Sequence, residues 1–509
     1  MAAPRILLWA GALIAGAAQA LSIAAPWDGQ PHWWLQLLSL AGLYGVLRRE
    51  MRPRGGFALA WLFAIAWLAG TFWWLYISMH VYGGLPAVLA ALAVLALAAF
   101  LGLYYAAAGA LFVRWRSGRR ARDALLFGGL WLAAELMRAS WFTGFPWGAG
   151  GYAHIDGPLD GLAPWIGVYG IGFLASLAAA LLASLSARPA WRSWRGAEGA
   201  LVLVAACGAL LGATALRPQT TPGGLSVALL QGNIPQDEKF QPGTGVPIAL
   251  RWYAEQLQGA KAQLVVAPET AIPMLPDQLP EGYWEALRGR FAQGGQAALV
   301  GIPLGSFSEG YTNSVVGLKP GQPAAYRYDK FHLVPFGEFI PPLFKWFTKM
   351  MDIPLGDFNR GAVRQPSFEW QGQRLAPNVC YEDLFGEDLA ARFADAATAP
   401  TMFVNVSNIG WFGDSVAIDQ HLQISRMRAI EFARPMIRAT NTGATVIIDA
   451  QGRVTHSLPR LTRAVLTGEV RGNERITPYA AWLARLGLWP LWALALGLVA
   501  LGRRRRPSA

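Results

Sequence analysis

Seven apolar stretches, each long enough to cross a lipid bilayer as a helix, follow one another in the first 216 residues, and an eighth lies near the C-terminus. A bilayer span needs about 20 predominantly apolar residues. Charged residues make up only 15% of the chain, against roughly 25% in soluble globular proteins. The sequence therefore predicts a polytopic α-helical membrane domain whose eight spans lie at 6–25, 30–47, 57–79, 85–113, 124–141, 163–186, 197–216 and 479–502.

The first apolar stretch also has features of a secretory signal peptide. Arg5 precedes an apolar run that ends in Ala18-Gln19-Ala20, which is a possible cleavage site. We favour an uncleaved first helix, because six further spans follow it before the first long polar segment.

Arginine-rich loops mark one side of the predicted membrane domain. Cytoplasmic loops collect Lys and Arg, and basic runs follow spans two, four, six and eight, whereas the loops near Asp28, Tyr82 and Asp156 hold almost none. Both termini are therefore expected in the cytoplasm. This distribution also explains the net charge of +12, because a nucleic-acid binder would gather its basic residues on one face of a folded domain. The runs are Arg48, Arg49, Arg52 and Arg54; Arg114, Arg116, Arg119, Arg120 and Arg122; Arg188, Arg192 and Arg195; and Arg503 to Arg506.

One long polar segment, 217–477, separates spans seven and eight, and the parity of the spans places it outside the cytoplasm. Short runs rich in Val, Ile and Leu predict buried strands, and segments with helical spacing of apolar residues alternate with them, which predicts a layered α/β domain. We therefore divide the chain into a membrane domain (1–216), an extracytoplasmic domain (217–477), and a last span with a basic cytoplasmic tail (478–509). The strands are expected at 225–230, 264–267, 298–301 and 402–406, and the helices at 246–261, 281–293 and 417–433.

Three side chains of the polar segment are candidates for chemistry, although each has a simpler interpretation. Glu269 follows a predicted strand at the edge where α/β sheets bind ligands, yet alone it would more often be a solvated loop residue or a helix cap. Lys330 stands among apolar and aromatic residues, where burial requires an acidic partner, yet alone it would be a surface lysine with a covered stem. Cys380 ends a strand before a predicted helix, whose amides would lower the thiol pKa, yet a lone cysteine is more often inert.

The three side chains together form a coherent set for acyl transfer. A thiol nucleophile needs a base that takes its proton, and the oxyanion formed after attack on an ester needs a positive group. Glu269 suits the first task, Lys330 the second, and Cys380 is the nucleophile. The six histidines lack the spacing of a zinc site, and no GxSxG motif or P-loop favours a serine hydrolase or a nucleotide-driven enzyme. No cofactor or metal is expected.

The order Glu269, Lys330, Cys380 resembles the triad of the nitrilase superfamily, whose members share an αββα sandwich. Within that superfamily, the spans on both sides of the domain and several further segments resemble the apolipoprotein N-acyltransferase family over nearly the whole chain. The resemblance therefore implies a nitrilase-like αββα sandwich for the polar segment. The further segments are Gln231-Gly232-Asn233-Ile234, Lys330 to Pro341, Cys380-Tyr381-Glu382, Trp411-Phe412-Gly413-Asp414-Ser415 and, in the membrane domain, Phe142 to Trp147.

This resemblance implies a two-step reaction at the periplasmic face of a bacterial inner membrane. The thiolate of Cys380 would take an acyl chain from a phospholipid as a thioester. It would then pass the chain to the α-amine of the N-terminal diacylglyceryl cysteine of an apolipoprotein, which completes lipoprotein maturation. Glu269 would act as base and then acid, and Lys330 would stabilise the oxyanion. The resemblance gives supporting roles to Glu338 and Glu382, and pocket positions to Tyr381 and Trp411.

Two positions depart from the pattern of the family. Ala267 stands where the family commonly has Trp before the Pro-Glu of the base motif, and Phe240 stands where it has Trp after the Gln-Gly-Asn segment. Both substitutions concern packing or lipid contact, so they bear on acyl-chain preference rather than on the reaction.

The stretch from Phe339 to Phe358 has aromatic residues beside lysines. Phe344 and Trp346 in this stretch are candidates for lipid contact, because an amphipathic arm of this composition can dip into headgroups. In that position it would gate lipid entry. The alternative is a segment that packs on its own domain.

Two other classes of protein stay open. A transporter, or a membrane protein whose polar domain only binds a partner, would usually have ionisable residues within its spans; only Glu135, Arg138 and Arg485 qualify, and they lie toward span ends. A membrane-tethered nitrilase-type amidase would act on a small amide. Whether lipid serves as the acyl donor distinguishes that amidase from an acyltransferase.

Overall fold

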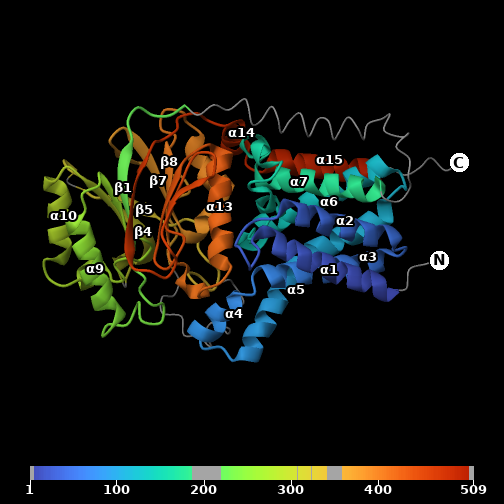
Figure 1. Ribbon diagram of the computed structural model, residues 1–509, viewed down its shortest axis with the longest axis horizontal. Helices are drawn as coiled ribbons and strands as arrows, with labels where there is room; N and C mark the ends of the chain where they lie inside the picture. The colour runs from blue at the N-terminus through green and yellow to red at the C-terminus, as the bar shows by residue number, and fades with distance from the viewer. Residues whose placement is uncertain (1–4, 186–218, 307, 323, 341–357, 504–509) are drawn as a thin grey trace. The chain divides into compact units, whose positions relative to one another are not determined.

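The computed structural model of the protein describes residues 5–185, 219–306, 308–322, 324–340 and 358–503. The chain divides into two compact units (Figure 1). The segment Trp74–Ala87, which lies between two apolar helices in the sequence, packs with the second unit. The first unit comprises Met1–Trp73, Val88–Arg217 and Leu486–Ala509, and the second comprises Trp74–Ala87 and Pro218–Arg485.

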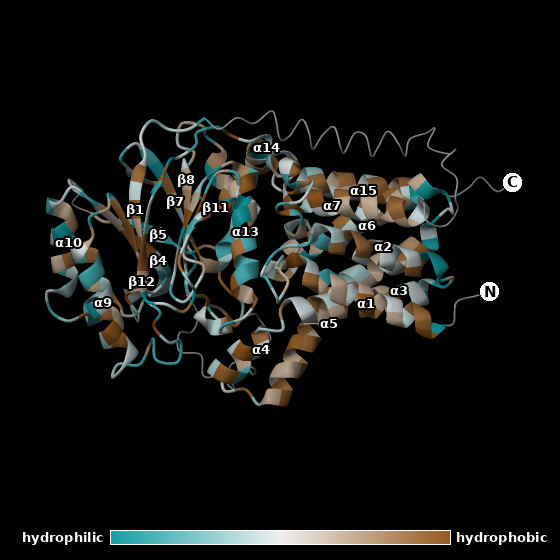
Figure 2. Ribbon diagram, viewed as in Figure 1, coloured by the Kyte–Doolittle hydropathy of each residue, from teal (hydrophilic) through white to brown (hydrophobic). Residues whose placement is uncertain are grey.

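The first unit is built from apolar helices (Figure 2). Four helical segments among the described residues are long and apolar enough to cross a membrane, at 5–23, 53–71, 87–115 and 160–184. The number rises to five if the bent pair formed by α14 (Pro478–Leu486) and α15 (Trp489–Arg503) is one span. The first four of these segments correspond to α1 (Arg5–Ile23), α3 (Pro53–Thr71), α5 (Ala87–Trp115) and α7 (Ala163–Leu185), and the same part of the chain also has α2 (Trp33–Arg49) and α6 (Arg120–Ser140).

Helices occupy the positions of seven of the eight predicted spans, and the remaining one, the seventh span at 197–216, lies outside the described residues. The count of eight therefore stays a prediction. The third helix ends at Thr71 and is followed by α4 (Leu75–Ile77) and a π-helix (Ser78–Tyr82). The predicted span at 479–502 is occupied by α14 and α15, which are bent by 87° relative to each other. The chain breaks there at Gly487, whose φ of 55° is the left-handed conformation that ends helices.

Two ionisable side chains of α6 hold a non-helical segment in place. Arg138 donates hydrogen bonds to the carbonyl oxygens of Phe145 and Trp147 at 2.8 and 2.7 Å. The Glu135 carboxylate accepts one from the amide of Gly150 at 2.7 Å. Backbone groups thus partner both buried side chains, as burial requires. Through these hydrogen bonds Arg138 and Glu135 hold residues 145–150 in place.

The second unit contains two six-stranded sheets, in the orders β12-β1-β2-β3-β4-β5 and β11-β10-β9-β8-β7-β6. Parallel strands form the middle of each sheet, β1 to β3 in one and β7 to β9 in the other, and the flanking strands are antiparallel. The strands are β1 (Leu225–Gln231), β2 (Leu264–Val266), β3 (Ala297–Ser306), β4 (Gly310–Leu318), β5 (Tyr326–Asp329), β6 (Phe368–Trp370), β7 (Gln373–Val379), β8 (Met402–Ser407), β9 (Met436–Thr440), β10 (Val446–Ile448), β11 (Val454–Ser457) and β12 (Ala464–Val470).

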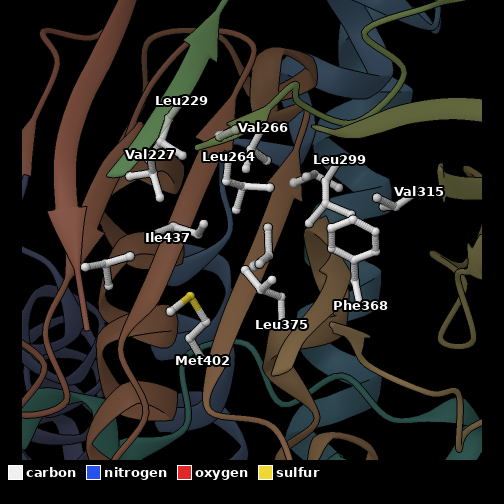
Figure 3. Close-up of a cluster of buried hydrophobic side chains, with 14 of the residues drawn as sticks. Val227, Leu229, Leu264, Val266, Leu299, Val315, Phe368, Leu375, Met402 and Ile437 are labelled. Atoms are coloured by element: carbon white, nitrogen blue, oxygen red, sulfur yellow. The ribbon is translucent and has the colours of Figure 1, made fainter. Parts of the chain in front are cut away.

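Successive side chains of a strand point to opposite faces of a sheet, and both faces of the first sheet are apolar. Val227 and Leu229 of β1 belong to a core cluster shared by both sheets, in which Leu264 and Leu299 lie with Met402 and Ile437 (Figure 3). The intervening residues of β1 belong to a second cluster with side chains of α9 (Gly245–Gly259) and α10 (Tyr283–Gln293). Burial on both faces explains why these strands read as continuous apolar runs in the sequence.

Helix α13 (Ala417–Phe432) packs on β9 of the second sheet (Figure 1). Helices thus cover the outer faces of two stacked sheets, so the predicted two-sheet α/β architecture is confirmed, as are the four predicted strands and the three predicted helices. The shorter helical elements are α12 (Gly386–Ala390) and 3-10 turns at Trp141–Thr143, Gly150–His154, Asp160–Leu162, Pro276–Gln278, Cys380–Leu384, Ala391–Phe393 and Ile409–Phe412.

Candidate active site

Glu269, Lys330 and Cys380 each stand just beyond the end of a strand. Glu269 follows β2, Lys330 directly follows β5, and Cys380 directly follows β7. The parallel strands β2 and β7 belong to different sheets, so the stacking of the sheets brings together residues that are more than a hundred positions apart. This is the edge at which ligands bind in α/β proteins.

Lys330 is the centre of a buried charge cluster. Its side chain is 1% exposed, and its Nζ lies 2.9 Å from the carboxylate of Glu338 and 3.5 Å from Oε1 of Glu269. Asn313 on β4 donates to both carboxylates at 2.7 Å, which fixes them relative to each other. Burial alone would lower the pKa of Lys330, but Glu338 and Glu269 outweigh it and raise this pKa above its ordinary value. The lysine is therefore held as a cation.

Glu269 is held as a carboxylate despite its burial. Its Oε2 accepts a hydrogen bond of 2.8 Å from the amide of Asn408, just beyond β8. Burial by itself raises the pKa of Glu269. The positive charge of Lys330 and the hydrogen bond from Asn313 are the largest effects that lower this pKa, and the net shift is downward. An ionised carboxylate is the state that a general base needs.

Cys380 is a partly exposed free cysteine with a strained backbone. Its φ is 51°, a left-handed conformation that is uncommon and costs energy for a residue with a Cβ. Burial raises the pKa of the Cys380 thiol to about 12, Glu269 raises it as well, and Lys330 opposes them. The expectation of a lowered thiol pKa is therefore wrong, because desolvation and the neighbouring carboxylate outweigh the short 3-10 turn that begins at Cys380. A base must remove the proton during the reaction.

Glu382 joins the segment that carries Lys330 to the segment that carries Cys380. Its carboxylate accepts hydrogen bonds from the amides of Phe331 and Val379, each at 2.7 Å, and from the hydroxyl of Tyr328 at 2.8 Å. A carboxylate with several donors is a strong anchor. Glu382 therefore fixes the two strand ends relative to each other rather than taking part in proton transfer.

A second buried network holds the backbone of Cys380 from the side of α13. The carbonyl oxygen of Cys380 accepts hydrogen bonds of 3.2 Å from Asn405 and from Nε2 of His421. The same nitrogen lies 2.9 Å from Asp383, while Arg438 donates to Nδ1 of His421 at 3.2 Å. Because Nδ1 of His421 accepts a hydrogen bond, the ring proton is on Nε2, which donates to the Asp383 carboxylate and to the carbonyl oxygen of Cys380.

The residues that the sequence predicted as pocket or lipid contacts lie in different surroundings, and two of them fall outside the described residues. Tyr381 is 4% exposed and packs on the rings of His332 and Phe385, so it is buried among aromatic side chains. Trp411 makes an edge contact of 6.0 Å with the ring of Tyr82. Phe240 is half-buried with Nζ of Lys239 5.8 Å from its ring centre. Phe344, Trp346 and nearly all of the proposed arm lie outside the described residues.

Sequence reasoning missed several residues that surround the triad. Asn313, Asn408 and His421 have no motif that distinguishes them from ordinary polar residues. Lys239 is 1% exposed, and its Nζ donates to the carbonyl oxygen of Glu269 at 3.0 Å. A signal was available for Lys239, because it adjoins Phe240, a position that the family resemblance had already marked.

Related proteins with an assigned function match the chain along almost its whole length. A protein of Verminephrobacter eiseniae described as apolipoprotein N-acyltransferase is 60% identical over 94% of this chain and 92% of its own. Another so described, from Ralstonia nicotianae, is 46% identical over 94% of this chain and 90% of its own. The chain belongs to the apolipoprotein N-acyltransferase family. Its residues 15–181 match the apolipoprotein N-acyltransferase N-terminal domain, and residues 226–477 match the carbon-nitrogen hydrolase family.

Membership of the apolipoprotein N-acyltransferase family makes the protein an acyl-transferring enzyme of the nitrilase superfamily. The described charge cluster fits an enzyme of that kind. It has an ionised acid, a buried cation and a protonated thiol, which follow the ends of β2, β5 and β7. Among the residues that the structure describes, no three or more His, Cys, Asp or Glu side chains are arranged as metal ligands.

Proposed function

We propose that the enzyme transfers an acyl chain from a phospholipid to the α-amine of the diacylglyceryl cysteine of an apolipoprotein, through a thioester on Cys380. The observation that carries the triad assignment is the buried position of Lys330, held between Glu269 and Glu338 next to the nucleophile. A fixed cation at that place stabilises an oxyanion without reorganisation during the reaction.

In the first step, Glu269 takes the thiol proton and Sγ of Cys380 attacks the ester carbonyl carbon of the phospholipid. Lys330 stabilises the resulting oxyanion. Collapse of the intermediate breaks the ester C–O bond, and the proton on Glu269 passes to the departing alkoxide, which leaves as a lysophospholipid alcohol. The raised pKa of Cys380 means that the proton transfer accompanies attack, rather than preceding it as a stable thiolate.

In the second step, the amine of the apolipoprotein attacks the thioester carbonyl. Glu269 accepts a proton from the amine nitrogen, the C–S bond breaks, and the sulfur regains a proton from Glu269. An amide and the free thiol result. Glu338 and Glu382 support this chemistry by fixing Lys330 and the strand ends, while Tyr381, Trp411 and Phe240, together with Phe344 and Trp346 of the arm, are proposed to contact the substrates.

The membrane arrangement belongs to the same proposal. Eight spans, cytoplasmic termini and a catalytic domain on the periplasmic side of the bacterial inner membrane are supported by the apolar segments and by the basic loops after every second span. The domains are 1–216, 217–477 and 478–509. An enzyme with two lipid-anchored substrates needs its site close to the membrane surface, which a multi-pass anchor provides.

Incubation with phospholipid alone tests the donor half of the reaction. Intact mass spectrometry of the purified protein in detergent should detect an acyl adduct that hydroxylamine removes, and Cys380→Ala should not acquire it. An adduct on both proteins would contradict the assignment of Cys380. A folded wild-type protein without an adduct would instead favour an amidase with a small amide substrate.

A further inference from the structure

Lys239 is a buried lysine that the proposed mechanism leaves without a task. It lies in the turn before α9, is 1% exposed, and its Nζ donates to the carbonyl oxygen of Glu269 at 3.0 Å. Removing an ammonium group from water costs several kcal/mol, in order of magnitude, unless other charges compensate. A neutral carbonyl cannot supply that compensation. The charged groups that act on Lys239 are Glu269 and Cys380.

The charges of the site explain why a second cation is useful there. Lys330 faces two carboxylates, those of Glu269 and Glu338, and Glu382 is a third buried acid. When the thiol proton moves to Glu269, negative charge moves from that carboxylate to the sulfur of Cys380. Lys239 donates to the backbone of Glu269, and both Glu269 and Cys380 raise its pKa, so it acts on both ends of this transfer.

We propose that Lys239 is a second cation of the active site, a positioning residue that fixes the backbone of Glu269 and stabilises negative charge on Sγ of Cys380. It exchanges no proton with substrate. The inference rests on the proposed role of Cys380 as the nucleophile. In addition, it makes Lys239 the group that lowers the free-energy cost of removing the thiol proton.

This role has a characteristic pH dependence. Burial lowers the pKa of Lys239 to about 7, although Glu269 and Cys380 oppose the shift. Lys239 is therefore charged below this pH and neutral above it, so its help to Cys380 is present in acid and is lost as the pH rises. The other charged groups that act on Cys380 are Glu269, Lys330, Glu338 and Arg438. All of them are retained in each variant below, so a comparison of rates isolates Lys239.

The test measures the alkylation rate of Cys380 by iodoacetamide in the full chain in detergent, with Cys207→Ala as background so that one thiol remains. Lys239→Met removes the charge and the hydrogen-bond donor, whereas Lys239→Gln removes the charge and retains a donor. Lys261→Met, at an exposed lysine, is the matched control. Near pH 6 both Lys239 variants should react about tenfold more slowly than the parent, the equivalent of one pKa unit. Near pH 9 the rates should converge, because the parent lysine is then neutral.

Equal rates in parent and variants at every pH would overturn the proposal. So would a slowing that is the same at all pH values, or one that Lys239→Gln abolishes, because either result indicates a structural hydrogen bond rather than a charge. If Lys239→Met does not fold, Lys239→Gln and the pH profile of the parent decide: a profile without an inflection near pH 7 overturns the inference. Alkylation needs neither phospholipid nor apolipoprotein, so its outcome is separate from that of the thioester assay.

Discussion

At the scale of single residues, the state of each active-site group is decided by its neighbours. Lys330 is almost completely buried, which would be unfavourable for an isolated lysine, yet two carboxylates within 3.5 Å keep it charged. Glu269 remains ionised for the reciprocal reason. Cys380 differs from both, because its surroundings favour the neutral thiol. The three shifts together favour an ionised Glu269, a charged Lys330 and a neutral Cys380 thiol, which are the states that the proposed mechanism requires.

Replacing Glu269 by Gln tests the base. The amide retains the size of the side chain but cannot take the thiol proton, so thioester formation should fall by a factor of about a hundred to ten thousand. The rate is measured by intact mass spectrometry after mixing with phospholipid. Asp277→Asn, at an exposed acid of the same loop region, should leave the rate unchanged. A Glu269→Gln enzyme that forms the thioester at the parental rate would exclude Glu269 as the base.

Replacing Glu382 by Gln tests the anchor between the two strand ends. The amide NH2 group would face the backbone donors of Phe331 or Val379, which would leave buried groups unsatisfied. We expect the free energy of unfolding to fall by about 3 kcal/mol, seen as a lower thermal midpoint in detergent. Glu369→Gln, at an exposed position of β6, is the control. Equal midpoints for the two variants would show that the Glu382 contacts contribute little.

At the scale of secondary structure elements, the position of Glu269 depends on a close approach between its loop and β3. A Cβ atom at Gly301 would lie 2.2 Å from the carbonyl oxygen of Pro268 and 2.8 Å from Cα of Glu269. Real Cβ atoms do not approach a backbone so closely. The absence of a side chain at Gly301 therefore lets the base lie directly over the strand beside β2.

A pair of glycine substitutions tests this packing. Gly301→Ala should push the loop outward, which lowers both thermal stability and the rate of thioester formation, by about tenfold or more since misplacement by about 1 Å has large effects on rate. Gly289→Ala is the matched change, because that glycine lies in α10 with nothing within 4 Å of its added Cβ. It should be neutral or stabilising by about 0.4–1 kcal/mol. Equal behaviour of the two variants would contradict the close-approach argument.

At the scale of the whole molecule, the decisive property is the arrangement across the membrane. Basic loops after alternate spans predict that the termini share one side and the catalytic domain has the other. The described residues include helices at seven of the predicted spans, but helices alone do not define a direction of insertion. The orientation therefore needs its own measurement.

Single cysteines introduced into a chain without its two native cysteines provide that measurement. Glu281→Cys lies at an exposed position of the catalytic domain, and Arg119→Cys lies at an exposed position of the loop before α6. A membrane-impermeant maleimide added to intact spheroplasts should label the first site and reach the second only after lysis. Labelling of Arg119→Cys before lysis, with protection of Glu281→Cys, would reverse the proposed topology.

The sequence by itself determined the positions of the apolar helices, four of the twelve described strands of the α/β unit, and the chain order of Glu269, Lys330 and Cys380. These features are local. A run of apolar residues fixes what a segment can be buried against, and a motif such as Cys380-Tyr381-Glu382 is contiguous. The same local reasoning explains its error at Cys380, which it treated as a cysteine at a helix start with a lowered pKa. It also gave no sign of the bend at Gly487 within the last predicted span.

Only the tertiary structure decided the environment of each reacting group. Glu269 and Lys330 would each read as surface residues in isolation. They become a buried pair because β2 and β5 end at the same edge of the first sheet, where Asn408, just beyond β8 of the second sheet, also contacts Glu269. The raised pKa of Cys380 and the place of Lys239 beneath Glu269 have the same origin. Desolvation and Coulomb interactions depend on distance in space, and these residues are separated by tens to more than a hundred positions along the chain.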